Sequence, residues 1–155
     1  MKRFQFRQES LLRIRRQLRR QAEMAVMQAR AQLVAVQHQK SELLADLERL
    51  NAAAWQNDTP LGTAFWQWQQ AAAFLNHSIQ QVETQIETHT QLVAERTDVL
   101  RQRTQEVEAL DALRVRQWRQ HQEEVAANRQ QLLDEVAMGQ WFQMQRSVEE
   151  ETHHG

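Results

Sequence analysis

The side chains that could hold a metal ion or act on a substrate are scattered along this chain of 155 residues. No two histidines have the i, i+4 spacing with which one face of a helix holds zinc, and no Gly-rich loop that could hold a phosphate is present. We interpret the adjacent pair His153-His154 as part of a frayed tail. The histidines are His38, His77, His89, His121, His153 and His154. We expect no catalytic residue, no metal site and no cofactor.

Two pairs of adjacent carboxylates, Glu123-Glu124 and Asp134-Glu135, are the remaining candidates for acid–base chemistry. A catalytic acid and base need a cavity that moves their pKa values apart, and a long helix offers none. Solvated helix faces are therefore the simpler interpretation. The serines lie along predicted helices without the sharp turn that exposes a nucleophile, and the absence of cysteine excludes disulfides and thiolate metal sites. We expect that the protein is not an enzyme.

Positive charge is concentrated near the N-terminus, although the net charge of the chain is only −1. Residues 1–30 contain nine Arg and Lys residues against Glu9 and Glu23. The densest part of this cluster is Arg13, Arg15, Arg16, Arg19 and Arg20. These arginines could bind phosphates or an acidic protein surface, or they could form a solvated face whose methylene stems cover apolar neighbours. No aromatic side chain that could stack on bases and no known nucleic-acid-binding motif accompanies them, which argues against a nucleic-acid partner.

Five aromatic residues lie within twenty positions of one another: Trp55, Phe65, Trp66, Trp68 and Phe74. At 100° per residue, Trp66 lies about 160° from Trp68 and Phe74 about 120° from it on the other side. If Trp68 is buried, the other two are exposed, and large exposed aromatics are typical anchors for a binding partner. The alternative is a local cap that closes the end of a hairpin, which explains Trp55 and Phe65 better than Trp66 or Phe74.

One segment, Asn57 to Thr63, interrupts an otherwise helical sequence, because it contains the only proline, Pro60, and one of three glycines, Gly62. Apolar residues spaced by threes and fours on both sides of it predict the seam of a coiled coil. Two successive fours through Leu18, Ala22 and Val26 predict a stutter. The predicted seam of the first helix is Leu11, Ile14, Leu18, Ala22, Val26, Ala29, Leu33, Val36, Lys40, Leu43, Leu47, Leu50 and Ala54. That of the second is Phe65, Trp68, Ala72, Leu75, Ile79, Val82, Ile86, His89, Val93, Arg96, Leu100, Arg103, Val107 and Leu110.

The predicted fold is all-α, a single elongated domain over residues 1–155 that forms a long antiparallel two-helix coiled-coil hairpin. We expect helices over about 7–56 and 63–138, a turn at 57–63, a break at Gly139 and a tail over 140–155. Residues paired across the seam should have numbers that sum to roughly 120. After about residue 115 the longer second helix has no partner in the first. Its apolar stripe, Trp118, Val125, Leu132 and Val136, therefore needs another surface.

Several segments together resemble the flagellar export protein family FliJ. They are the opening Phe4-Gln5-Phe6 with Leu11-Leu12, the short turn between long helices, and the stretch from Asn128 to Ala137 that contains Leu133-Asp134-Glu135-Val136-Ala137. The resemblance covers about residues 1–140. It implies a stalk like that of rotary F-type ATPases, with both chain termini at one end. The implied partners are the flagellar export ATPase hexamer, the cytoplasmic domain of the membrane export gate and export chaperones.

The resemblance also implies which residues meet these partners. The ATPase ring would contact Arg13, Arg16, Arg20, Trp118, Val125, Leu132 and Val136. The gate would contact Trp66, Ala71, Phe74, Leu75 and Ser78 near the turn, with Val82 as the next matching position and further positions near Leu43, Leu47 and Leu50. This chain departs from the family example by having Ala71 in place of a phenylalanine and by lacking the tyrosines expected on the first helix.

No signal peptide and no run of about 18 apolar residues is visible, so we expect a soluble cytoplasmic protein. The resemblance places it at the flagellar base, on the inner face of the cell membrane, held there by protein partners. Our leading hypothesis is a stalk that couples the ATPase to the gate and escorts chaperones. The alternatives are the equivalent stalk of a virulence-type secretion system, an RNA-binding helical arm and a self-associating coiled coil.

Overall fold

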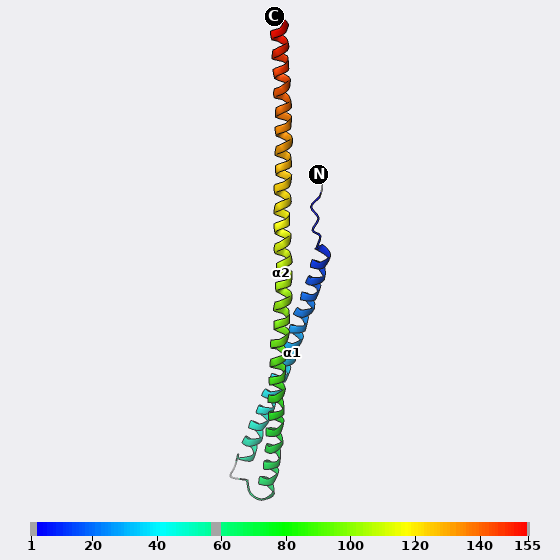
Figure 1. Ribbon diagram of the computed structural model, residues 1–155. Coiled ribbons are helices and arrows are strands. Elements are labelled where there is room, and N and C mark those ends of the chain that lie inside the picture. The colour runs from blue at the N-terminus through cyan, green and yellow to red at the C-terminus, as the bar shows by residue number, and fades with distance from the viewer. Residues whose placement is uncertain (1–2, 57–59, 155) are drawn as a thin grey trace. The chain divides into compact units, whose positions relative to one another are not determined.

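The computed structural model describes residues 3–56 and 60–154 and shows an all-α protein with no strand in that part of the chain. Helix α1 is Glu9–Ala54, with 46 residues, and α2 is Thr63–His154, with 92 residues (Figure 1). The predicted hairpin with a longer second helix is confirmed. Within residues 3–56 and 60–154, no helix is long and apolar enough to cross a membrane.

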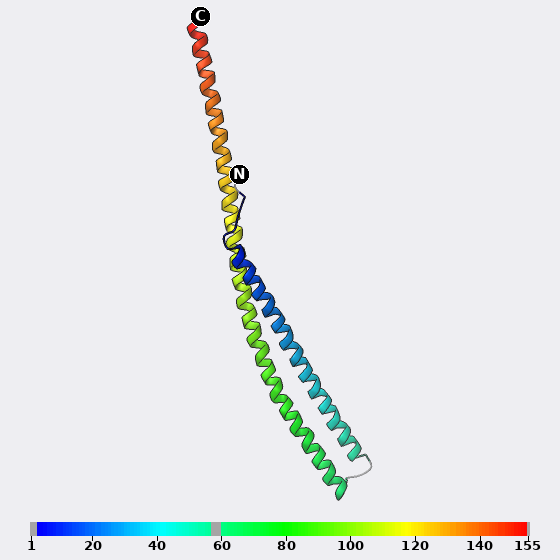
Figure 2. The same cartoon turned by 90° about the vertical axis from the view of Figure 1, so that its right-hand side faces the viewer.

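The chain forms two compact units. The hairpin unit is Arg13–Val107, and the terminal unit consists of Met1–Leu12 and Glu108–Gly155. In the hairpin unit α1 and α2 pack side by side and antiparallel, as Figure 2 shows between the blue-to-cyan and green helices.

The core of the hairpin unit is the predicted seam. Its buried residues include Ala22, Val26 and Ala29 from α1, and Ala72, Ile79, Val82 and Val107 from α2. Polar contacts between the helices fix the register: Arg15 pairs with Glu106, Lys40 with Glu83, and Trp68 donates to Asn51. The paired residue numbers sum to between 119 and 123. The antiparallel register predicted from the turn is therefore confirmed.

The path of the seam at the start of α1 differs from the prediction. Ile14 is 57% exposed and Leu11 is also exposed, whereas Arg15 and Arg19 are half-buried. The buried path therefore also runs through Arg15, Arg19 and Ala22 in alternating fours and threes, while Leu18 on the predicted path is half-buried too. Arginine can occupy such positions because its methylene stem covers apolar surface while the guanidinium reaches water. Two further seam predictions, Phe65 and Arg96, are also exposed.

The ends of the helices were predicted to within two residues, with one exception. Residues 57–59 of the predicted turn lie outside the described residues, and Gly62 has the positive φ of 64° that favours glycine. The exception is Gly139, because α2 continues through it to His154, so the predicted end near residue 138 and the frayed tail are wrong. A glycine inside a helix costs only about 1 kcal/mol relative to alanine, and the flanking residues are good helix formers.

Candidate functional surfaces

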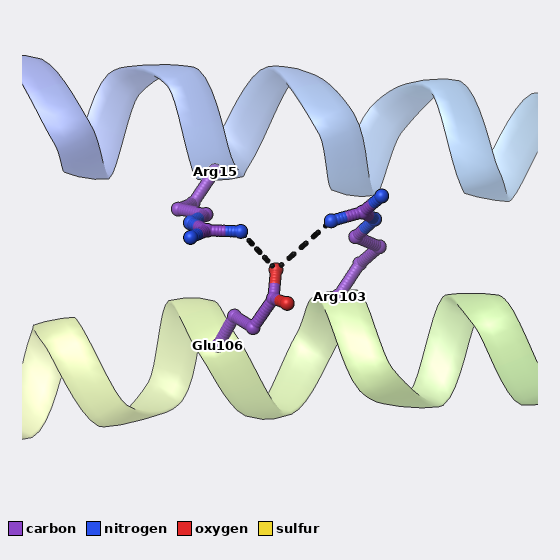
Figure 3. A network of polar contacts seen from close by, with 3 residues as sticks. All are labelled: Arg15, Arg103 and Glu106. Carbon is purple, nitrogen blue, oxygen red and sulfur yellow. Dashed lines mark hydrogen bonds and ion pairs between the residues drawn. The ribbon is translucent and has the colours of Figure 1, made fainter.

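A network of three charged side chains joins the two helices of the hairpin unit (Figure 3). Oε2 of Glu106 accepts hydrogen bonds from Nη1 of Arg15 at 2.9 Å and from Nη1 of Arg103 at 3.3 Å. All three side chains are about one third exposed, and ion pairs of this kind contribute only about 0–1 kcal/mol each. The network therefore serves mainly to fix the register of the two helices. It does not resemble a catalytic site.

At the turn end of the hairpin unit, aromatic side chains pack on one another around Trp68. The ring centroid of Trp68 lies 5.7 Å from that of Trp55 and 5.6 Å from that of Phe65. Nε1 of Trp68 donates to Oδ1 of Asn51 at 3.0 Å. These residues form the local cap that was one interpretation of the aromatic cluster.

The other two aromatics near the turn are available to a partner. Trp66 is 59% exposed and Phe74 is 70% exposed. Trp66 borders a shallow depression with Gln69, Gln70 and Ala73. Both aromatics lie away from the Trp68 seam, as the helical arithmetic predicts.

The five predicted gate residues do not share one face of α2. Ala71, Leu75 and Ser78 are half-buried along one flank of the seam, and Phe74 lies on the same flank, roughly 40–60° further out than Ala71 and Ser78. Trp66 lies about 140° around the helix from Ala71. Leu43, Leu47 and Leu50 of α1 are half-buried in the seam. A single partner surface that approaches from one side would therefore meet Phe74, Ala71 and Ser78 together, but not Trp66.

The arginine cluster divides into two groups. Arg15 and Arg19 lie along the seam, where Nε of Arg19 is 3.8 Å from Oε1 of Glu23. Arg13 and Arg20 are exposed and lie away from the seam, where Nη2 of Arg20 donates to Oε1 of Gln17 at 3.0 Å. Arg16 is half-buried and lies only about 60° around α1 from Arg19. Of the three arginines predicted to face the ATPase, Arg13 and Arg20 therefore lie away from the seam and Arg16 borders it.

In the terminal unit, part of the apolar stripe on α2 has a partner that the sequence did not reveal. The segment before α1 places Phe4 against Trp118, with ring centroids 5.2 Å apart, and against His121 at 5.6 Å. Arg114 also approaches Glu9, with Nε 3.8 Å from Oε2. Phe4, which precedes α1, therefore covers one side of Trp118.

Beyond Val125, which is half-buried, every residue of α2 from 126 to 153 is exposed. Leu132 is 62% exposed and Val136 is 57% exposed, so the predicted stripe lacks a covering surface there. The same stretch contains further large apolar residues that are exposed. Leu133 and Met138 lie outside the predicted stripe, and those beyond Gly139 were missed because the segment 140–155 had been interpreted as a tail: Trp141, Phe142, Met144 and Val148.

No metal site is found in the part of the chain that the structure describes, since no three His, Asp or Glu side chains come together there. His38 instead lies 3.1 Å from Glu42, one turn further along α1 on an exposed face.

These features define a class of protein, an antiparallel coiled-coil hairpin with exposed apolar and basic side chains. The model of the family described as Flagellar FliJ protein matches residues 4–146. The chain belongs to the FliJ family and is thus a component of the flagellar protein export apparatus. No curated protein and no solved structure matches it.

Proposed function

We propose that the protein is a non-enzymatic stalk that couples the flagellar export ATPase to the membrane export gate and escorts export chaperones. In this role it changes ATP hydrolysis by binding the ATPase ring, and it hydrolyses nothing itself. It acts in the cytoplasm at the inner face of the cell membrane, held there by its protein partners.

The observation that carries this proposal is the exposed apolar stripe at the end of α2. Leu132 and Val136 are more than half exposed, and exposed apolar side chains at regular spacing are typical of a surface that a partner covers. Together with Trp118 and Val125 they are the residues that we assign to the ATPase. Arg13, Arg16 and Arg20 of the hairpin unit provide a second, basic contact.

The gate contact in this proposal is the flank of α2 that carries Ala71, Phe74, Leu75 and Ser78, with Trp66 as a separate anchor. Phe74 supports it most strongly. Its side chain is 70% exposed, so burial against a partner would remove a large apolar area from water.

Titration of the protein into the purified export ATPase tests the stalk role. We expect ATP hydrolysis or ring assembly to change, and no change in either would refute it. Truncation after residue 115 should abolish the effect while circular dichroism still reports a helical protein.

A single substitution gives a sharper version of this test. Leu132→Glu places a charge on the apolar stripe and should weaken the effect on the ATPase at least tenfold. Gln131→Glu is the matched control, because it adds the same charge at an exposed position about 100° around the helix. If both variants weaken the effect equally, net charge is responsible. If neither weakens it, the stripe is not the contact.

A further inference from the structure

The outer face of α1 carries a second stripe of residues at coiled-coil spacing. Within the hairpin unit, positions away from the seam recur at spacings of three, four and seven residues and fall within an arc of about 80°. The members of this outer stripe are Arg13, Arg20, Met24, Met27, Ala31 and Val34. A helix with such stripes on two faces can pack against one helix on each of those faces.

The apolar part of the outer stripe is open to solvent. Met24 and Met27 are each 70% exposed and Val34 is 62% exposed, whereas Val26 and Ala29, on the seam side, are each 3% exposed. Scattered exposed apolar residues are ordinary, but four apolar positions on one stripe at heptad spacing are not. Methionine is well suited to such a surface, because its flexible thioether side chain adapts to different partner side chains.

The charged residues of the outer stripe are confined to one of its ends. Its two arginines, Arg13 and Arg20, lie at the N-terminal end, and the apolar residues follow towards the turn. A partner helix that covers the whole stripe therefore needs carboxylates at the end that lies against Arg13 and Arg20, and apolar residues along the rest.

We propose that the outer stripe of α1 is the docking surface for an amphipathic α-helix of another protein, one with an acidic end. The helix packs on the outer face of α1, with its apolar stripe over Met24, Met27, Ala31 and Val34 and its carboxylates beside Arg13 and Arg20. The inference rests on the proposed function in one respect, because the same arginines are assigned to the proposed ATPase contact. RNA is a poorer occupant, since no aromatic side chain lies on the stripe for bases to stack on.

The test uses two synthetic amphipathic helical peptides that share leucines at heptad spacing and differ only at one end, which carries glutamates in one and lysines in the other. Binding to the full chain is measured by fluorescence anisotropy. We expect the glutamate-ended peptide to bind at least tenfold more tightly, and Met27→Glu to weaken its binding at least tenfold. Gln32→Glu, an exposed position about 140° around α1 from Met27, should change binding less than twofold.

Equal binding of the two peptides, or equal effects of Met27→Glu and Gln32→Glu, would overturn the proposal. Sedimentation that shows a dimer which Met27→Glu dissociates would assign the stripe to a second copy of the chain and would also overturn it. So would anionic lipid vesicles that bind the protein through Met27. Because the peptide assay contains no ATPase, its failure is distinct from failure of the stalk role, which the ATPase titration reports.

Discussion

Substitution of valine by alanine should affect stability very differently in the seam and on the outer stripe of the hairpin unit. Val82 of α2 is 4% exposed in the seam, and Val34 of α1 is 62% exposed on the outer stripe. Val→Ala removes about two methylene equivalents, or about 1.6 kcal/mol of burial at about 0.8 kcal/mol each, and leaves a small cavity at the buried position. Alanine is the better helix former by up to about 0.7 kcal/mol, and this gain applies at both positions.

Val82→Ala should therefore lower the free energy of unfolding by about 1–2 kcal/mol, and Val34→Ala should leave it unchanged or raise it slightly. Urea unfolding followed by far-UV circular dichroism measures both. If the two variants lose equal stability, burial in the seam does not hold the helices together and our account of the hairpin is wrong. A loss at Val34 alone would show that the outer stripe is already covered in the free protein.

Four other predictions follow from particular contacts. Glu106→Gln should cost about 0.5–1.5 kcal/mol in urea unfolding at low salt, with a smaller loss at high salt, because it removes both partly exposed ion pairs. Gly139→Ala should increase helix protection in hydrogen exchange around that residue, since no atom lies within 4 Å of an added Cβ; unchanged protection would contradict a continuous helix. Phe4→Ala should increase acrylamide quenching of Trp118 in a chain that keeps no other tryptophan. Phe74→Ala should weaken binding to the cytoplasmic domain of the export gate at least tenfold in calorimetry without altering the circular dichroism spectrum.

Much of the fold could be predicted because its information is periodic. Residue spacing alone predicted the seam, and Pro60 with Gly62 predicted the pairing register, which Arg15–Glu106 and Lys40–Glu83 confirm. The error at Ile14 arose because apolar residues were preferred over arginine at a position where only the arginine stem is needed. The error at Gly139 arose because one unfavourable residue was given more weight than the long helical sequence around it.

The candidate surfaces were less predictable, and for different physical reasons. The exposure of Trp66 and Phe74 followed from helix geometry once Trp68 was assigned to the seam. The contact between Phe4 and Trp118 was not predictable, because a segment without regular secondary structure has no period that fixes where its side chains lie. Met24 and Met27 stand in a heptad pattern in the sequence, but only the structure shows which of the two stripes on α1 is buried.

The solvated stretch of α2 from 126 to 153 has a kinetic consequence. A helix that lies against no other element keeps its shape through local hydrogen bonds alone, so its turns open and close within microseconds. A partner that binds this stretch must hold those turns in the helical conformation. The conformational entropy lost on binding weakens the complex and shortens its lifetime. Contacts made there are thus suited to rapid release and rebinding.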